Sequence, residues 1–395
     1  MIQNNFKGLN LSLLGFGAMR LPLSGSDGNA PVDENATNEM VRFAHENGVN
    51  YYDTAAPYHN GQSERIIGSI LRQFPRDSYY LATKYPGHQV SASFDPQTTF
   101  NEQLEKCGVE FFDFYLLHNV CEYSIHTYKD KRWGIIDYFL EQKKNGRIRH
   151  FGFSSHGYTE NLKQFLDEFG EVMEFCQIQM NYLDWSLQDA KAKYELLTER
   201  NIPVWVMEPV HGGILAQLPI ESSQKLKTLR PDYSVAAWAF RWLQMFPNVK
   251  MILSGMSNME QVVDNVKTFT EPNPLSSEEI ELLYEIASVM KNSLPCTACR
   301  YCCAECPKEL DIPLLLSLYN EARVSPSIGV GMRVDALPVD ERPSACISCG
   351  SCNRLCPQNI DIPLAMKEFT EMLATKVPNW AEICRQRELA AQKNK

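Results

Sequence analysis

The chain lacks any hydrophobic run long enough to cross a bilayer, and residues 1–7 do not have the pattern of a signal peptide. It also lacks an excess of positive charge, because 38 lysines and arginines stand against 48 aspartates and glutamates and give a formal net charge of −10. This balance argues against nucleic acid or an anionic membrane surface as a partner. We therefore expect neither membrane attachment nor nucleic-acid binding.

The chain also lacks the regular cysteine framework of a secreted disulfide protein. Five of its thirteen cysteines are scattered and odd in number, namely Cys107, Cys121, Cys176, Cys303 and Cys384. Free thiols persist in a reducing compartment, so we expect a cytoplasmic protein. With 395 residues and 44% hydrophobic content, the chain is long enough for two domains and a sizeable core.

The remaining eight cysteines form two frames that both read C-x2-C-x2-C-x3-C-P. They are Cys296, Cys299, Cys302 and Cys306 in the first frame, and Cys346, Cys349, Cys352 and Cys356 in the second. This run binds [4Fe–4S] clusters, and in two-cluster ferredoxins the fourth cysteine of each run ligates the other cluster. We therefore assign cluster one to Cys296, Cys299, Cys302 and Cys356, and cluster two to Cys346, Cys349, Cys352 and Cys306. Zinc is the main alternative, although it normally takes two C-x2-C pairs rather than a triplet.

The frames belong to a longer internal repeat, in which residues 306–314 match residues 356–364. In each copy an Asp and then a Pro precede an apolar-periodic stretch, which predicts helices over 314–322 and 364–373. The spacer between the frames is rich in proline and glycine and is predicted to be mostly loop. The region resembles helical dicluster ferredoxin modules, such as those in fumarate reductase iron–sulfur subunits. This implies a small, mostly α-helical dicluster ferredoxin-like domain over residues 291–376, followed by a tail over 377–395.

Residues 1–290 alternate short apolar segments with longer amphipathic ones. The predicted strands are 13–17, 50–55, 79–84, 113–118, 150–154, 176–180, 204–209 and 251–254, and predicted helices include 35–46, 63–73, 100–107, 135–145 and 187–199. Eight strands with helical crossovers predict an α/β fold of the (β/α)8 TIM barrel type. The alternative, an open doubly wound sheet, usually carries a glycine fingerprint whose third glycine is missing after Gly15-x-Gly17. A further helix is predicted from Ser277, where Ser276 and Glu279 form a capping box, and Pro295 marks the boundary of the barrel.

Polar residues follow three neighbouring predicted strands at the end where barrels carry their chemistry. They are Asp53, Tyr58, Lys84 and His118. Each has a simpler explanation as a turn cap, a packed ring or a surface charge, but together they predict a site. An ammonium next to a phenol is expected to lower the phenol's pKa, so that Tyr58 can protonate a carbonyl oxygen as general acid while His118 orients it. The hydride for such a reduction must come from a nicotinamide.

At these residues the chain resembles the aldo-keto reductase family, over residues 1–290. The matching stretches are Leu14–Gly17, Asp53–Tyr58, Ala82–Lys84, Asp113–His118, Gly152–Ser155 and Gln177–Gln179. The resemblance implies NADP(H)-linked reduction of aldehydes or ketones, or the reverse oxidation, with NAD(H) as the alternative. It also implies a catalytic tetrad of Asp53, Tyr58, Lys84 and His118, and a nicotinamide held by Ser154, Ser155 and Gln179. Ser155 departs from the family's asparagine, and Met207 stands where a stacking tyrosine is frequent.

The phosphate end of the coenzyme is implied by a loop that resembles the family's adenosine-phosphate loop. Its residues are Ser254, Gly255, Ser257, Gln261 and Asn265, and a helix N-terminus in this loop is expected to bind an anion. The Lys and Arg that several branches use for the 2′-phosphate are replaced by Gly255 and Gln261. Gly17, Met19 and Arg20 after the first strand complete the predicted coenzyme site, and Arg20 could equally contact the pyrophosphate, contact the substrate or be a surface charge.

The whole layout resembles the ferredoxin-fused branch of this family, and three interpretations of the fusion stay open. In the first, the clusters link a carbonyl-reducing barrel to a redox partner such as a ferredoxin or a flavoprotein. In the second, the clusters only brace the C-terminal domain. In the third, the protein senses redox state through bound nicotinamide, and turnover is incidental. The mouth loops offer further candidates for a substrate wall, namely Tyr85, His88, Phe94, Tyr123, His126, Tyr128, Trp133, Tyr182, Asp184, Trp185 and His211.

Overall fold

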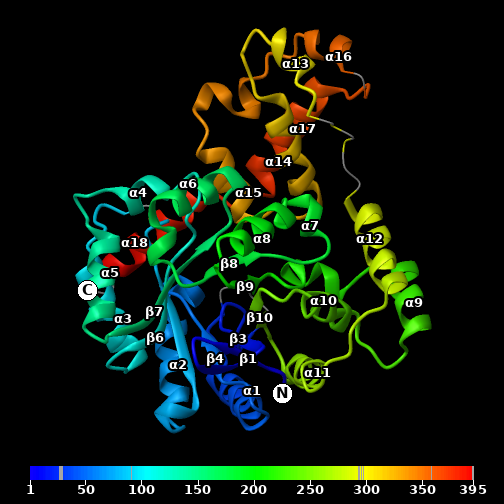
Figure 1. Ribbon diagram of the computed structural model, residues 1–395. Helices are drawn as coiled ribbons and strands as arrows, with labels where there is room; N and C mark the ends of the chain where they lie inside the picture. Colours follow the sequence, from blue (N-terminus) through cyan, green and yellow to red (C-terminus); the bar gives the residue numbers. More distant parts are fainter. Residues whose placement is uncertain are drawn as a thin grey trace. The chain divides into compact units, whose positions relative to one another are not determined.

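The computed structural model describes residues 1–25, 30–89, 91–291, 294, 296, 298–356 and 358–393 (Figure 1). Pro295, the predicted boundary of the barrel, and Pro357, the proline that ends the second cysteine frame, lie outside the described residues. The chain divides into two compact units. The first comprises residues 1–88 and 92–283, and the second comprises residues 89–91 and 284–395.

The first unit is built on a closed barrel of eight parallel strands in the order β10-β3-β4-β5-β6-β7-β8-β9. The strands are β3 (Leu14–Gly17), β4 (Tyr51–Asp53), β5 (Tyr80–Tyr85), β6 (Phe112–Leu117), β7 (Ile148–Ser155), β8 (Cys176–Gln179), β9 (Val204–Met207) and β10 (Val249–Gly255). Every predicted barrel strand is confirmed within a few residues at each end. The closed order also decides against the open doubly wound sheet.

Helices connect the strands. They are α1 (Glu34–Glu46), α2 (Ser63–Leu71), α3 (Pro96–Cys107), α4 (Ile125–Lys129), α5 (Ile135–Lys144), α6 (Thr159–Phe169), α7 (Asp184–Leu187), α8 (Ala190–Glu199), α9 (Ile220–Leu229), α10 (Val235–Leu243), α11 (Met259–Thr268) and α12 (Ser277–Lys291). The predicted helices are all found, although α8 begins at Ala190 because Leu187 ends the separate turn α7. The predicted capping box is confirmed: Ser276 N donates to Glu279 Oε2 at 2.8 Å, and Glu279 N donates to Ser276 Oγ at 3.2 Å.

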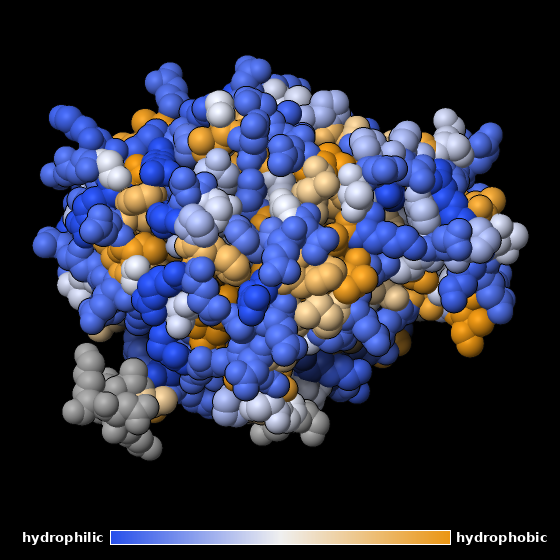
Figure 2. All heavy atoms as spheres, turned by 90° about the horizontal axis from the view of Figure 1, so that it is seen from below, coloured by the Kyte–Doolittle hydropathy of each residue, from blue (hydrophilic) through white to orange (hydrophobic). Residues whose placement is uncertain are grey.

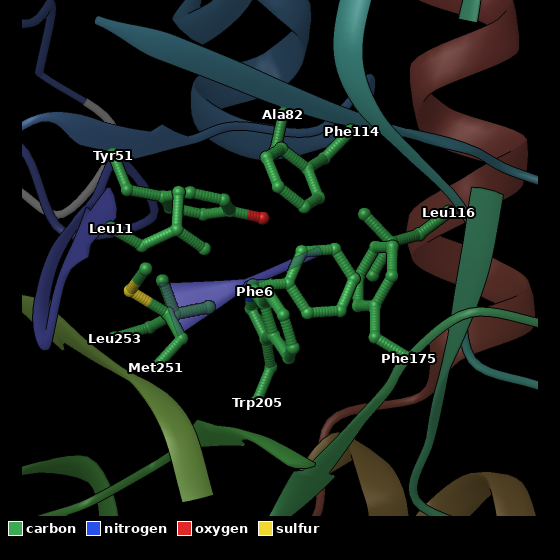
Figure 3. Close-up of a cluster of buried hydrophobic side chains, with 10 residues drawn as sticks. All are labelled: Phe6, Leu11, Tyr51, Ala82, Phe114, Leu116, Phe175, Trp205, Met251 and Leu253. Atoms are coloured by element: carbon green, nitrogen blue, oxygen red, sulfur yellow. The ribbon is translucent and has the colours of Figure 1, made fainter. Parts of the chain in front are cut away.

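A two-stranded hairpin, β1 (Gln3–Phe6) and β2 (Leu9–Ser12), precedes the barrel and was not predicted. Its two turn residues, Lys7 and Gly8, have φ values of 50° and 86°, which is the left-handed region that two-residue hairpin turns require. The hairpin places Phe6 in an aromatic cluster inside the barrel (Figure 3). There the Phe6 ring lies edge-on to Trp205 at 4.9 Å and 5.8 Å from Phe114, so the hairpin buries apolar surface at the end opposite the strands' carboxyl termini.

A buried carboxylate stabilises the same end of the barrel. Glu174 accepts hydrogen bonds from Lys7 Nζ at 2.7 Å and from Phe151 N at 3.0 Å, forms an ion pair with Lys143 at 2.6 Å, and contacts His150 Nδ1 at 3.0 Å. Burial acts to raise the pKa of Glu174, but the hydrogen bonds from His150, Lys143 and Lys7 lower it well below its usual range. Because this end of the barrel lies opposite the strands' carboxyl termini, we expect the charge to serve stability rather than chemistry.

A Glu174→Gln variant is therefore expected to unfold at a lower temperature at pH 7, because its free energy of unfolding should be smaller by about 1–3 kcal/mol. Because the folded pKa lies below the unfolded value of about 4.3, this stabilisation is present above that pH and disappears as pH falls through the folded pKa. Thermal unfolding should show a difference in melting temperature between the wild type and the variant at pH 7, and this gap should narrow below about pH 4.3. The exposed neighbour Glu171 supplies the control, since Glu171→Gln should leave the melting temperature unchanged. A gap that does not change with pH would contradict this account.

The second unit is helical. Besides the end of α12 it contains α13 (Tyr301–Ala304), α14 (Ile312–Val324), α15 (Ile328–Asp335), α16 (Ser351–Leu355), α17 (Ile362–Thr375) and α18 (Trp380–Lys393). The predicted helices α14 and α17 are confirmed, and each is capped by the Asp that precedes it, Asp311 and Asp361. Short helix α13 packs beside α16, as α14 packs beside α17, so the two sequence copies are paired in space (Figure 1).

The expectation that the spacer between the frames is mostly loop is wrong in part, because α15 occupies residues 328–335. Ser327 caps this helix by accepting a hydrogen bond from Val330 N. A Cβ at Gly331 would stand 3.1 Å from the Pro378 carbonyl, so the glycine permits close packing of the helix rather than ending it.

The surface shown in Figure 2 is covered mainly by hydrophilic side chains, and its apolar side chains gather only in small groups. Within the described ranges, no helix combines the length and the apolar composition needed to cross a membrane.

Candidate functional site

Four polar side chains meet at the carboxyl ends of β4, β5 and β6. Asp53 ends β4, Lys84 is the penultimate residue of β5, and Tyr58 opens a 3-10 turn after β4. Lys84 Nζ donates to Asp53 Oδ1 at 2.5 Å, to the Thr54 carbonyl at 2.8 Å and to the Tyr58 hydroxyl at 3.3 Å. His118 directly follows β6, and its ring lies edge-on to the Tyr58 ring, with 5.9 Å between centroids. The structure thus brings the carboxylate, ammonium, phenol and imidazole into one site.

The protonation states of this site follow from burial and charge. Burial acts to lower the pKa of Lys84, but Asp53 and Tyr58 raise it, so the ammonium stays charged. Burial raises the pKa of Tyr58, and Lys84 opposes this only in part. The expected lowering of the phenol pKa by Lys84 is present, but burial outweighs it, so the net shift of the Tyr58 pKa is upward. Tyr58 is protonated at neutral pH, which is the form that donates a proton.

His118 is held as a neutral ring. Burial lowers its pKa well below the usual value, and His88, Lys84 and His156 act in the same direction. The His88 ring packs against the His118 ring at 4.2 Å, and the Tyr128 hydroxyl donates to the His118 carbonyl at 2.5 Å. Tyr128 is buried, so it braces His118. His118 Nδ1 has no hydrogen-bond partner among the described residues.

The residues expected to hold the nicotinamide carboxamide lie at the ends of β7 and β8. Ser154 Oγ accepts from Asn119 N at 2.8 Å. Ser155 Oγ donates to the Val120 carbonyl at 2.7 Å and accepts from Gly157 N at 3.1 Å. The Ser155 hydroxyl therefore holds the loop after β7 in place, which leaves Ser154 better placed to face a ligand.

Gln179 belongs to a polar network that the sequence did not predict. Its Oε1 lies 3.2 Å from His156 Nδ1, and its Nε2 donates to Asp184 Oδ2 at 2.9 Å. The same Asp184 oxygen lies 2.8 Å from His211 Nδ1 and accepts from Asn181 Nδ2 at 2.5 Å. Burial acts to raise the pKa of Asp184, but His211 and these hydrogen bonds lower it. The network fixes the orientation of Gln179 at the mouth of the barrel.

Other polar residues near the tetrad also carry no sequence signal of their own. Glu64 is buried in α2 and accepts from Thr83 Oγ1 and Gln103 Nε2, both at 2.6 Å. Gln103 also donates to the Lys84 carbonyl at 3.0 Å, which holds β5 in register beside α3. Burial raises the pKa of Glu64.

The loop after β10 lies against the loop after β3. A Cβ at Gly255 would stand 3.3 Å from Arg20 Cβ, so the glycine admits the Arg20 stem. The guanidinium of Arg20 lies 4.0 Å from Glu208 Oε1, and Ser257 Oγ donates to the Arg20 carbonyl at 2.8 Å. Arg20 thus links the two loops that carry predicted coenzyme residues, because it follows β3 and contacts Gly255 at the end of β10 and Ser257 just after it.

The remaining predicted coenzyme residues brace this loop or adjoin it. Asn265 Nδ2 donates to Ser254 Oγ at 2.8 Å, and Gln261 Oε1 accepts from Ser257 N at 2.7 Å. Gly17 pairs with both Asp53 and Gly255 in the sheet register. Met19 is half exposed, and Met207 at the end of β9 accepts from Gln177 Nε2 through its sulfur at 3.5 Å.

Eight cysteines of the second unit line two separate cavities. One is lined by Cys346, Cys349, Cys352 and Cys306, and the other by Cys296, Cys299, Cys302 and Cys356. These are the two quartets in which the fourth ligand is exchanged between frames. Among the residues with described positions, no three His, Cys, Asp or Glu side chains converge closely enough to hold one metal ion.

Residues 13–288 match the aldo/keto reductase family, and residues 295–360 match the 4Fe-4S dicluster domain. The chain belongs to the aldo/keto reductase family. It is an oxidoreductase of that family with a C-terminal 4Fe–4S domain, as the resemblance to the ferredoxin-fused branch predicted.

Its relatives share the barrel. The uncharacterized oxidoreductase YqkF of Bacillus subtilis is 26% identical over 307 residues, which cover 70% of this chain and 92% of the relative. The NADH-specific methylglyoxal reductase of Escherichia coli is 22% identical and covers 72% of this chain and 97% of its own length. The holo form of aldo-keto reductase AKR11C1 from Bacillus halodurans has a TM-score of 0.57 at 25% identity, covering 72% of this chain and 96% of that one.

Proposed function

We propose that the barrel catalyses NAD(P)H-dependent reduction of an aldehyde or ketone to an alcohol, or the reverse oxidation, with Tyr58 as the general acid. The observation that carries this proposal is the hydrogen-bonded chain from Asp53 through Lys84 to the Tyr58 hydroxyl, with His118 beside it. A protonated phenol next to a buried ammonium can give its proton to a carbonyl oxygen while Lys84 stabilises the developing phenolate. The neutral His118 ring can donate a hydrogen bond to the same oxygen and orient it.

The residues around the tetrad fit a nicotinamide coenzyme, which would supply the hydride. Gln177 Oε1 and Asp53 Oδ2 are buried polar atoms that lack a hydrogen-bond partner within the described structure. Ser154 and Gln179 would hold the carboxamide, Met207 would lie against the ring, and Arg20 with the loop over residues 254–257 would meet the phosphates. Gly255 and Gln261 stand where several branches of the family use a Lys and an Arg to bind the 2′-phosphate of NADPH. Both NADH and NADPH are therefore tested.

We further propose that the two cysteine quartets hold [4Fe–4S] clusters and that these link the barrel to a one-electron partner, such as a ferredoxin or a flavoprotein. The two cavities, each lined by four cysteines, support the clusters. Clusters and free thiols persist under reducing conditions, which agrees with a place in the cytoplasm.

The test uses protein purified without oxygen, with iron and sulfide quantified. We expect about eight of each per chain. NADH and NADPH binding is followed by quenching of protein fluorescence, and coenzyme oxidation is followed with a panel of aldehydes, ketones and quinones. Coenzyme oxidation that depends on a carbonyl compound supports the proposal. Tight coenzyme binding without turnover on any carbonyl would favour redox sensing instead, and zinc in place of iron would overturn the cluster assignment.

A further inference from the structure

The two cysteine-lined cavities have different electrostatic surroundings, although the sequence copies that build them are similar. Equivalent residues of the copies are fifty positions apart, as Cys306 and Cys356 are. The copies agree at the four cysteines of each frame and in the Asp that caps the following helix. They differ at the residues that approach the cysteine sulfurs.

The cavity of cluster two carries groups that favour negative charge. Lys308 lines it, is exposed, and forms no ion pair within the described structure. Ser351 Oγ lies 3.7 Å from Cys349 Sγ. A lysine and a hydroxyl therefore lie beside one quartet.

The cavity of cluster one has none of these groups at the equivalent positions. Gln358 replaces Lys308, and Tyr301 replaces Ser351. Tyr301 is 62% exposed, so its side chain points into solvent.

One cation, Arg300, does line the cavity of cluster one. Its Nη1 donates to both carboxylate oxygens of Asp311, at 3.1 and 3.0 Å, so the adjacent acid offsets part of its charge. In the second copy Gly350 replaces this arginine, and Asn353 Nδ2 instead donates to Asp361 at 3.2 Å. Neither Asp311 nor Asp361 lines its cavity, and each accepts a hydrogen bond of 3.3 Å from the backbone of the following helix, from Leu314 N and Leu364 N respectively.

We infer that the two quartets hold clusters of unequal reduction potential, with cluster two the more easily reduced. This inference rests on the proposal that both quartets bind [4Fe–4S] clusters. Adding one electron makes a cluster more negative, and nearby cations and hydrogen bonds to the sulfurs stabilise the reduced form. An electron delivered to the domain therefore resides on cluster two, and cluster one stays oxidised until a second electron arrives.

The experiment is a dithionite titration of the anaerobically purified full chain, followed by EPR. We expect two one-electron steps at separate potentials. Lys308→Gln installs the residue of the other copy and should lower only the upper step, by roughly a tenfold change in the one-electron equilibrium or about 59 mV. Gln358→Lys is the matched reverse change and should raise only the lower step.

Every variant must keep about eight irons per chain, so that a lost cluster is not mistaken for a shifted potential. Two steps at the same potential, or a Lys308→Gln variant that moves only the lower step, would overturn the inference. Wild-type protein without iron would instead overturn the cluster assignment on which it rests. The two failures are therefore distinguishable in one preparation.

Discussion

A Tyr58→Phe variant is expected to lose carbonyl reduction by a factor of roughly 10² to 10⁴ in kcat while its affinity for the coenzyme is unchanged. The substitution removes one hydroxyl and leaves the Lys84–Asp53 hydrogen bond in place. The loss should be this large because burial lowers the pKa of the next group, His118, and keeps its ring neutral, and the N–H of a neutral imidazole is a far weaker acid than that of an imidazolium. Steady-state kinetics and coenzyme titration by fluorescence measure both quantities.

Tyr80 offers the matched control, because it lies at the first residue of the strand that carries Lys84, at the opposite end of the barrel. Tyr80→Phe should leave kcat unchanged. A Tyr58→Phe variant that keeps most of its activity would show that the proton comes from elsewhere, and the assignment of Tyr58 would fail.

A Cys356→Ser variant is expected to lose about four irons and cluster one, although Cys356 belongs to the second sequence frame. The structure places Cys356 in the cavity with Cys296, Cys299 and Cys302. The EPR spectrum of Cys356→Ser after dithionite reduction should therefore match that of Cys299→Ser. By the same reasoning, Cys306→Ser should match Cys349→Ser, because these two cysteines share the other cavity.

Cys303→Ser is the control, since Cys303 lines neither cavity. It should keep about eight irons. If the spectrum of Cys356→Ser matched that of Cys349→Ser, each frame would hold its own cluster and the exchanged assignment would be wrong.

The barrel could be predicted from the sequence because its strands are short apolar runs separated by amphipathic helices, a pattern that few other folds share. The hairpin at its base could not, since each strand has only four residues and Lys7-Gly8 is a weaker turn signal than Asn-Gly. Helix α15 was not predicted because glycines such as Gly329 and Gly331 are typical of loops. In the structure Gly331 permits close approach to Pro378, which is a tertiary effect that no local pattern records.

The tetrad could be predicted because each of its members follows or ends a strand, and the barrel brings neighbouring strand ends together. The hydrogen-bond network on Gln179 could not, because His156, Asp184 and His211 follow three different strands, β7, β8 and β9, and meet only in the folded chain. The sign of the Tyr58 pKa shift was also beyond the sequence, since it depends on how far the hydroxyl is removed from water. Sequence identifies which charges are neighbours, whereas burial decides which effect is larger.

The most direct test of the proposed reaction is the transfer of deuterium from coenzyme labelled at C4 of the nicotinamide ring. The account predicts that the alcohol formed from an accepted aldehyde or ketone carries one deuterium at the former carbonyl carbon, detected by mass spectrometry, and that Tyr58→Phe forms this product at least a hundredfold more slowly. Alcohol that forms without deuterium, or labelled coenzyme that is oxidised while its electrons appear only on the clusters, would contradict carbonyl reduction by hydride transfer in this barrel.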